Sequence, residues 1–497
     1  MKPAILLHKN DHVAVALRHI KKGEIFSIEG VPAKVQLKED IRKGHKFSIV
    51  PIKKGEEIWK YGYSIGVATE DIEQGAWVHI HNMQTGLSGI LEYSYQPTAY
   101  ASSIKQTNHS FRGYVRENGE VGIRNEIWII NTVGCINKSC EQLAKMANHK
   151  FSDQVDGVHH FSHPYGCSQL GDDLTYTQKL LASLANHPNA AGVLVMGLGC
   201  ENNQIEEFKE VIGDQPSGRI KFLNAQTVDD EIEIGMDMIE QLVEYACQFT
   251  RVAVPVSKLK VGLKCGGSDG LSGITANPLV GALADLINSA QGTTIMTEVP
   301  EMFGAETILM NRAVDEEVFQ KIVDLVNDFK AYFIRHNQEI YENPSPGNKN
   351  GGITTLEEKS LGCTQKGGNF QVQEVMRYGE RVCKKGLNLL QAPGNDLISV
   401  TALAAAGAHI VLFTTGRGTP FGGPVPTMKI STNSELAMKK KNWIDFNAGE
   451  LLEGKSLEML SKELFREILD LASGEKMTKN EVFDFREISI FKDGVIL

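Results

Sequence analysis

The sequence lacks the marks of a secreted, disulfide-stabilised protein. Its 497 residues include 8 cysteines, too few for a disulfide framework in a chain of this length. The N-terminal apolar run over residues 4–7 is too short for the core of a signal peptide. We therefore expect a cytoplasmic protein whose thiols are reduced and free to serve a metal.

Basic charge and long apolar runs are also scarce. Asp and Glu number 61 against 51 Lys and Arg, which gives a formal net charge of −10 and disfavours nucleic acid and anionic lipid as partners. The lysine run over residues 439–441 is typical of a solvated helix end. The uncharged stretch over residues 397–416 is interrupted by Gly407 and His409, and fits a helix, a turn and a buried strand better than a membrane span. We expect neither nucleic acid nor membrane as a partner.

Several cofactor signatures are missing. No G-x-x-x-x-G-K-[ST] phosphate loop occurs, and the glycines over residues 416–422 are not spaced as in a dinucleotide fingerprint. No Cys-x-x-Cys pair exists, and Cys135 and Cys140 lack the third nearby cysteine of a plant-type iron–sulfur loop. Nucleotide binding is therefore disfavoured, and an iron–sulfur centre stays open only as a minor alternative.

The first hundred residues are organised around a repeated turn signature. It consists of an isoleucine, two polar residues and a glycine, and it occurs at residues 20–23, 41–44, 52–55 and 72–75. The isoleucine can anchor in a core, while the glycine supplies the positive φ of a tight turn. With short strand-like pieces such as 13–17 and 64–68, the pattern predicts a small, mainly β domain over residues 1–95. An unperiodic stretch then predicts a linker over residues 96–110.

Beyond residue 111, short apolar strands alternate with amphipathic helices. Strands are expected at 126–131, 192–196, 259–264, 293–296, 387–391 and 410–413, and helices at 228–248, 278–290 and 315–335. This alternation is typical of parallel sheets covered on both faces. Residues 251–258 look like an exposed connector, so we divide the region into two α/β domains, 111–255 and 256–497.

Polar groups gather in the loops that follow these strands. They include Cys135, His163, Cys167, Cys200, Glu201, Cys265, Ser268, Asp269, Asn277, Glu298, Glu301 and Arg417. Ligands of open α/β sheets bind at the carboxyl ends of strands, so these loops predict a shared active-site cleft. Any one of these cysteines, taken alone, is more often a small buried apolar residue.

A His-x-His pair lies in the N-terminal domain. If residues 77–82 form a strand, His79 and His81 point to the same face and can converge on one divalent ion. Imidazole ligands suit Fe, Mn or Zn more than Ca or Mg. Polar surface on an exposed strand is an equally good explanation of the pair alone. Further histidines, among them His45, are available as ligands.

Longer motifs give the chain a resemblance to a known family. They are Gly44–Lys46, Lys60–Gly62, Ile65–Gly66, Val78–Asn82, Phe111–Arg116, Val121–Asn125, Gly197–Glu201, Cys265–Asp269, Asn343–Asn348 and Phe413–Pro420. The chain resembles the altronate/galactarate dehydratases, sugar-acid hydro-lyases with an N-terminal SAF (β-clip) domain, over essentially its whole length. The His-x-His-Asn run favours the altronate branch. Galactarate dehydratase and sulfolactate sulfo-lyase remain alternatives on the same scaffold, as does a non-catalytic carbohydrate-binding protein.

The resemblance implies a multidomain α/β fold, with a small mainly-β SAF domain followed by two α/β domains with largely parallel sheets. It also implies dehydration of D-altronate to 2-dehydro-3-deoxy-D-gluconate with Fe(II) or Mn(II). We expect His79 and His81 to hold this metal, His163 or Lys46 to act as base, and His45 or Asp269 as acid. Substrate-binding residues are expected to be Ser268, Asn277, Asn348, Lys349, Arg417 and Thr419. The partner is a small sugar acid, and we expect a homodimer.

Overall fold

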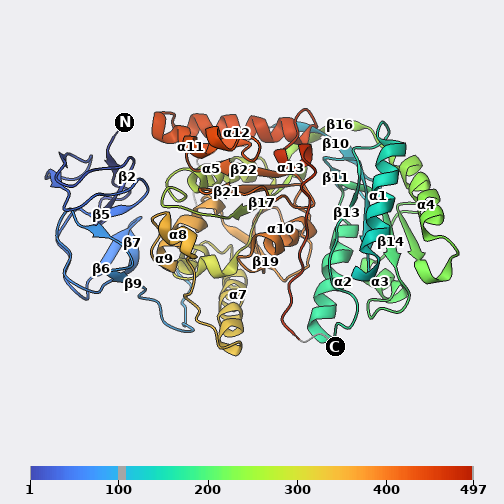
Figure 1. Ribbon diagram of the computed structural model, residues 1–497, viewed down its shortest axis with the longest axis horizontal. Coiled ribbons are helices and arrows are strands. Elements are labelled where there is room, and N and C mark those ends of the chain that lie inside the picture. The colour runs from blue at the N-terminus through green and yellow to red at the C-terminus, as the bar shows by residue number, and fades with distance from the viewer. Residues whose placement is uncertain (1, 99–107, 495–497) are drawn as a thin grey trace.

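The computed structural model describes residues 2–98 and 108–494 and places three parts side by side (Figure 1). The N-terminal β domain lies at one end of the molecule, and the part that follows residue 110 lies at the other. The C-terminal part, beginning near residue 256, lies between them. Most of the linker predicted over 96–110 falls on residues 99–107, outside the described residues, and Ser110 already begins a strand.

The N-terminal domain is built from short antiparallel strands. One sheet has the order β1 (Ala4–Ile5), β2 (Val13–Ala16), β5 (Lys46–Ser48), β8 (Trp77–Val78); a second has β6 (Glu57–Lys60), β7 (Tyr63–Ala68), β9 (Met83–Gln84); β3 (Ile25–Phe26) pairs with β4 (Val35–Gln36). All four glycines of the repeated turn have φ between 82° and 87°. The four isoleucines are buried and bridge in pairs, Ile20 with Ile41 and Ile52 with Ile72. The predicted role of the repeat is confirmed.

The second part contains a four-stranded parallel sheet. Its order is β13 (Val158–His160), β12 (Glu126–Asn131), β14 (Ala190–Gly197), β15 (Ile220–Asn224). The helices are α1 (Asn137–Phe151), α2 (Gly171–Ala185), α3 (Ile205–Ile212) and α4 (Glu231–Ala246). The strands predicted at 126–131 and 192–196 are confirmed. Their sequences could be recognised because a strand buried on both faces is a continuous apolar run.

The connector predicted over residues 251–258 is wrong. Residues Arg251–Pro255 form β16, which pairs antiparallel with β10 (Ser110–Val115); β10 also pairs with β11 (Val121–Gly122). Val252 and Ala253 of β16 are exposed. An edge strand that shows its side chains to solvent resembles a connector in sequence, and its partner lies about 140 residues earlier in the chain.

The C-terminal part is centred on a seven-stranded parallel sheet. Its order is β19 (Val372–Met376), β20 (Gly386–Leu390), β18 (Thr293–Met296), β17 (Lys260–Cys265), β21 (Ile410–Thr415), β22 (Thr427–Ser431), β23 (Phe446–Asn447). The helices are α5 (Ala276–Ser289), α6 (Glu306–Met310), α7 (Glu316–Arg335), α8 (Pro346–Asn350), α9 (Leu356–Cys363), α10 (Asp396–Ala405), α11 (Ser434–Lys439), α12 (Leu457–Ala472) and α13 (Lys479–Val482). The predicted multidomain α/β fold is confirmed.

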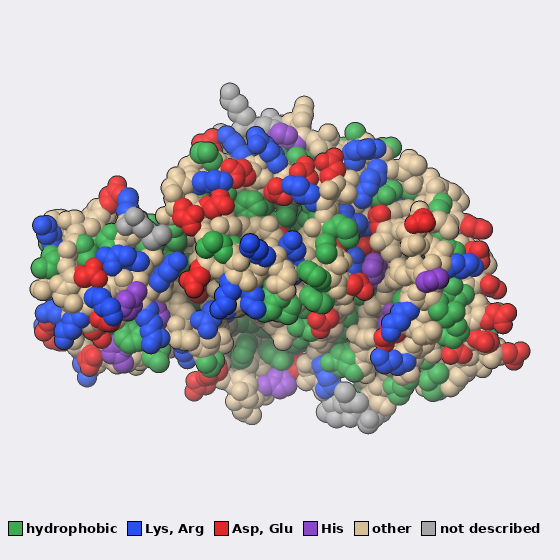
Figure 2. All heavy atoms as spheres, turned by 45° about the horizontal axis from the view of Figure 1, so that its top comes forward, with side chains coloured by type: hydrophobic (Ala, Val, Ile, Leu, Met, Phe, Trp, Pro, Cys, Tyr) green, Lys and Arg blue, Asp and Glu red, His purple; other side chains and the backbone are tan. Residues whose placement is uncertain are grey.

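The uncharged stretch over residues 397–416 divides as expected into α10, a turn at Gly407 and β21. Among the helices of the described residues, none has the length and apolar character needed to cross a membrane. On the face shown in Figure 2, basic and acidic side chains are intermingled.

A close backbone contact docks the N-terminal domain on the C-terminal part. The carbonyl oxygen of Gly44 lies so near Gly270 and Gly352 that a Cβ there would be 1.8 Å and 2.4 Å away from it, respectively. Any side chain at these two positions would therefore push the domains apart. The contact brings His45 and Lys46, which follow Gly44 in the chain, against the segment that carries α8 and α9.

Candidate functional site

A buried ion-pair network joins the two domains. Lys46 Nζ and Lys60 Nζ, both from the N-terminal domain, each lie 2.8 Å from a carboxylate oxygen of Glu358 on α9. All three side chains are at most 2% exposed. Burial acts to raise the pKa of Glu358, but the two ammonium groups prevail and lower it to about 2. Burial lowers the pKa of Lys46 to about 8 despite the attraction of Glu358.

His45 has one ring nitrogen available for proton transfer. Its Nε2 lies 3.1 Å from the carbonyl oxygen of Asn350, which can only accept, so Nε2 carries the proton and Nδ1 the lone pair. The buried Nδ1 has no hydrogen-bond partner among the described residues. Burial also lowers the pKa of His45 below its ordinary range, so the ring is neutral at neutral pH. A neutral imidazole with a free lone pair is suited to act as a base.

The premise of the His79–His81 prediction is wrong, because strand β8 ends at Val78 and both histidines lie in the turn that follows. His79 is buried and His81 is exposed, and both rings pack against Trp77. Among the described residues, no group of three potential ligands within 4.8 Å includes this pair. Metal binding by His79 and His81 therefore stays a prediction, and the described residues offer no third ligand within 4.8 Å of both.

His79 is instead tied to the domain interface. Its Nδ1 lies 3.1 Å from Thr354 Oγ1, and that hydroxyl accepts a hydrogen bond from Lys46 Nζ. The hydroxyl proton of Thr354 is thus free to point at His79. Burial, aided by the charge of Lys46, lowers the pKa of His79 to about 3.

A narrow pocket beside this network holds three of the predicted residues. Ser268, Asp269 and Asn277, from the loop after β17 and the start of α5, line it together with Lys60 and Glu358. Asp269 accepts hydrogen bonds from the Leu271 amide at 3.1 Å and the Thr432 hydroxyl at 3.0 Å. Burial nevertheless raises the pKa of Asp269 above its ordinary range. A carboxyl group of raised pKa is suited to donate a proton.

The other predicted substrate-binding residues differ in how they are placed relative to this pocket. Asn348 is buried and donates a hydrogen bond to the carbonyl oxygen of Ser268 at 2.8 Å, so it supports the pocket. Arg417 is exposed next to Gly267, at the start of the pocket loop. Lys349 is partly exposed, and Thr419 accepts a hydrogen bond from a nearby backbone amide.

The structure does not bring His163 to this site. It follows β13, which lies at the opposite end of the molecule from the N-terminal domain (Figure 1). Its Nε2 donates to the carbonyl oxygen of Asn131 at 2.9 Å, and its Nδ1 accepts from the Tyr165 amide at 3.2 Å. Both ring nitrogens are thus committed within their own loop, so this geometry does not favour His163 as base, and the role stays a prediction.

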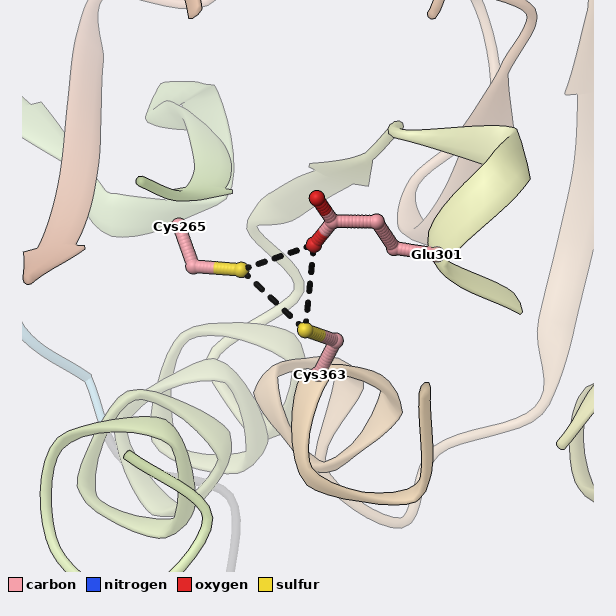
Figure 3. Close-up of side chains that lie close together, drawn as sticks. All are labelled: Cys265, Glu301 and Cys363. Atoms are coloured by element: carbon pink, nitrogen blue, oxygen red, sulfur yellow. Dashed lines mark hydrogen bonds between the residues drawn. The ribbon is translucent and has the colours of Figure 1, made fainter. Parts of the chain in front are cut away.

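At the wall of the pocket, three side chains that can bind a metal converge (Figure 3), and Cys363 among them lines the pocket itself. Cys265 ends β17, Glu301 lies in the 3-10 turn Val299–Met302 after β18, and Cys363 ends α9. The two sulfur atoms are 3.2 Å apart, and Glu301 Oε2 lies 3.3 Å from Cys265 Sγ and 3.1 Å from Cys363 Sγ. We call these three residues the thiol cluster. All three are buried.

Three lysines surround the thiol cluster. Lys366 Nζ lies 2.8 Å from Cys265 Sγ, Lys359 Nζ lies 2.8 Å from Glu301, and Lys264 pairs with Glu298 and with Asp396. Burial acts to lower the pKa of Lys366, but the negative charge of its neighbours raises it well above its ordinary value. The hydrogen bond with Cys265, together with burial, raises the pKa of Cys363.

The residues present fit a divalent cation. Ligand atoms bound about 2.1–2.3 Å from one ion lie roughly 3.5 Å apart in tetrahedral geometry, close to the separations found here. The ammonium groups of Lys264, Lys359 and Lys366 balance the carboxylates of Glu298, Glu301 and Asp396. A divalent cation that displaces the two thiol protons leaves this balance unchanged.

Comparison with known proteins decides the family. Three family models match in sequence: the altronate/galactarate dehydratase SAF domain over residues 2–86, the D-galactarate dehydratase/altronate hydrolase second domain over 113–247, and the D-galactarate/altronate dehydratase C-terminal domain over 256–496. The altronate dehydratase of Bacillus subtilis is 52% identical, with 100% of each chain covered, and that of Escherichia coli is 52% identical, with 99% of each covered. The chain belongs to the altronate/galactarate dehydratase family. The galactarate dehydratase (L-threo-forming) of Escherichia coli is more distant, at 32% identity over 95% of this chain and 93% of its own.

Family membership makes the chain a carbon–oxygen lyase that dehydrates sugar acids. The resemblance inferred from the sequence motifs is confirmed, and a non-catalytic carbohydrate-binding protein is no longer supported. Within this dehydratase, the thiol cluster and the interface network share one wall, because α9 carries Glu358, Lys359 and Cys363.

Sequence reasoning missed most of this wall. Lys60 enters the sequence analysis only within the motif Lys60–Gly62, Glu358 and Lys359 do not enter it, and Cys363 is not connected there with Cys265. All eight residues of α9 are buried, so the helix lacks the polar face that periodicity detects. One signal was available: two acids and a lysine stand together at residues 357–359, a few residues after the glycines at 351 and 352.

Proposed function

We propose that the protein dehydrates D-altronate to 2-dehydro-3-deoxy-D-gluconate and water. The observation that carries the proposal is the 52% identity to two altronate dehydratases over essentially the full chain. The reaction removes the proton on C2, next to the carboxylate, and expels the hydroxyl group of C3. The resulting enol tautomerises to the 2-keto acid, so atoms and charge balance.

We further propose that Cys265, Glu301 and Cys363 hold the divalent metal. Their two thiolates favour Fe(II) over Mn(II), because sulfur ligands suit the softer ion. The bound ion would supply positive charge to offset the charge that develops on the substrate carboxylate when the C2 proton leaves. Lys264, Lys359 and Lys366 hold the three ligands in place and keep the surrounding charge balanced.

The proton transfers are proposed for residues at the domain interface. His45 Nδ1, with its free lone pair, takes the C2 proton, and Asp269, with its raised pKa, donates a proton to the leaving hydroxyl. The Lys46 ammonium donates to Glu358 and to the Gly352 carbonyl oxygen, so its role is to position the site. Arg417 pairs with the substrate carboxylate, and Ser268, Asn277, Asn348, Lys349 and Thr419 contact the hydroxyl groups. A homodimer and a cytoplasmic location remain predictions from the sequence.

A substrate panel tests the activity. The purified chain is incubated with altronate, galactarate, mannonate and sulfolactate under reducing conditions, with Fe(II) or Mn(II), and 2-keto acid is measured. We expect altronate to be turned over with the highest kcat/KM. Faster turnover of galactarate, or release of sulfite from sulfolactate, would replace the proposed substrate.

Substitution of His45 by glutamine should remove the base while keeping a polar side chain of similar length. We expect kcat to fall by about 100-fold or more, since general base catalysis contributes roughly 10²–10⁴-fold. In the wild type, kcat/KM should rise with pH through a value below about 6.5, because burial lowers the pKa of His45 and only the neutral ring accepts a proton. An unchanged kcat in the His45→Gln variant would refute this role.

The carboxylate contact is tested through Arg417→Lys. The variant keeps the charge but loses the planar fork that binds a carboxylate through two hydrogen bonds. We expect KM for the sugar acid to rise by about 10-fold with a smaller effect on kcat. If steady-state kinetics show the same KM as the wild type, Arg417 does not bind the substrate.

A further inference from the structure

Three cysteines outside the thiol cluster lie at one edge of the second part of the chain. Cys135 follows β12, Cys167 lies in the loop that follows β13, and Cys200 follows β14. These strands are neighbours in the parallel sheet, in the order β13-β12-β14, so their carboxyl ends meet at the same edge. All three thiols are exposed, and the proposed dehydration uses none of them.

The loops that carry these cysteines touch one another around Gly166. The Gly166 carbonyl oxygen accepts from the Asn202 amide at 3.1 Å, and the Tyr165 carbonyl oxygen accepts from the Gly134 amide at 2.8 Å. A Cβ on Gly166 would lie 1.9 Å from the Thr132 carbonyl oxygen. Backbone atoms within three residues of each cysteine are thus in contact with another of the three loops.

Glu201 holds this arrangement rigid. Its carboxylate accepts hydrogen bonds from the Thr132 hydroxyl at 2.6 Å and from the Leu198 and Gly199 amides at 3.0 Å and 2.6 Å. It therefore clamps the Cys200 loop to the start of the Cys135 loop. A rigid frame of this kind reduces the cost of ordering three ligands around a cofactor.

Two buried polar atoms beside the cysteines have no partner among the described residues. They are Gln169 Nε2 and Asn203 Oδ1, from side chains 1% and 0% exposed. Gln169 binds the Gly166 amide through its other amide atom, and Asn203 binds the Thr132 carbonyl oxygen, so both adjoin the point where the loops meet. The unsatisfied N–H of Gln169 is a donor available to a sulfide or thiolate, whereas Asn203 Oδ1 can only accept.

We propose that Cys135, Cys167 and Cys200 bind an iron–sulfur cluster of the [4Fe–4S] type. A single ion does not suit the three thiols, because they do not all lie within 4.8 Å of one another, whereas the thiol cluster does meet that limit. A cluster does not require its thiolates to lie within 4.8 Å of one another, since each binds a different iron. Helices α1, α2 and α3 begin after the three cysteines, and their N-termini favour the negative charge of a thiolate-bound cluster.

Assembly of the cluster on the three cysteines balances in electrons and protons. Two ferrous and two ferric ions with four sulfides form a [4Fe–4S]²⁺ core without net electron transfer, and each of the three thiols loses one proton to bind an iron. The three cysteines would hold three of the four irons. The fourth would keep an open position for an oxygen ligand, such as a hydroxyl or carboxylate group.

The test is direct measurement of the cluster. The full chain is incubated anaerobically with ferrous and ferric iron and sulfide, desalted, and analysed for iron, acid-labile sulfide and broad visible absorption. We expect about four sulfides per chain in the wild type and a loss of most of them in Cys135→Ser, Cys167→Ser and Cys200→Ser. Acid-labile sulfide separates this site from any single iron at the thiol cluster, so the result does not depend on the proposed dehydration.

Two other exposed cysteines serve as matched controls. Cys247 and Cys383 are exposed but lie outside these loops, so Cys247→Ser and Cys383→Ser should retain the full sulfide content. The proposal is overturned if the wild type retains no more sulfide than the triple serine variant, or if the control variants lose as much. Iron bound without sulfide that is lost from the triple serine variant would also overturn it, since it would show a single ion at these three cysteines.

Discussion

Replacing Cys363 by alanine should reduce kcat/KM for the sugar acid by at least about 100-fold while the protein stays folded. Cys363 contributes one of the three ligand atoms of the thiol cluster, within 3.1 Å of Glu301 and 3.2 Å of Cys265. Loss of a residue that merely supports a metal ligand already costs roughly 10–100-fold, so loss of a ligand should cost more. The measurement is kcat/KM as a function of added Fe(II) or Mn(II), together with the melting temperature.

The matched control is Cys140→Ala. Cys140 is also buried, but it packs against Met196 in the second part of the chain, far in sequence from the thiol cluster. Both variants remove one buried sulfur and should lower the melting temperature by similar small amounts. Equal activity of the two variants at saturating metal would exclude Cys363 as a ligand.

Replacing Glu358 by glutamine should destabilise the protein by about 3–5 kcal/mol, the usual result of removing one member of a buried ion pair. The glutamine cannot balance the charges of Lys46 and Lys60, which are at most 2% exposed. Because the two lysines come from the N-terminal domain, we also expect that domain to detach from α9. The measurements are the free energy of unfolding in urea and the rate of proteolysis near residue 95.

In the wild type, the pairing of Glu358 with Lys46 and Lys60 should also appear in how the free energy of unfolding depends on pH. The pKa of Glu358 is lowered from 4.5 to about 2, so its contribution is complete above about pH 4.5 and is lost as the pH falls toward 2. The Glu358→Gln variant should not show this loss of stability between about pH 4.5 and pH 2. Glu458→Gln is the control, because Glu458 forms an exposed pair with Lys462 one helical turn away, and such pairs contribute little. Equal stability of the two variants would contradict the prediction.

Much of the local structure followed from side-chain pattern. The isoleucine–glycine turns, the strand at 126–131 and the division of residues 397–416 are as predicted, because each depends on neighbours in the chain. The candidate pocket was predicted in part for the same reason, since Ser268 and Asp269 directly follow a strand. The turn at His79 was missed because strand β8 pairs with β5 only through residues 77 and 78.

The tertiary structure alone decided which distant residues share a site. Cys265 and Cys363 are separated by 98 residues, and Lys46 and Glu358 by 312. No periodicity links residues so far apart, because their contact depends on strand order and on the docking of whole domains.

The amino-acid sequence by itself determined where the chain turns, which segments form strands and helices, and which loops carry polar side chains. These features follow from backbone preferences and from the repeat of apolar residues over short stretches. Only the tertiary structure decided that His45 contacts the end of α8, that His163 is held within its own loop, and that α9 joins an ion-pair network to a thiol cluster. Those choices depend on the packing of surfaces that no short segment contains.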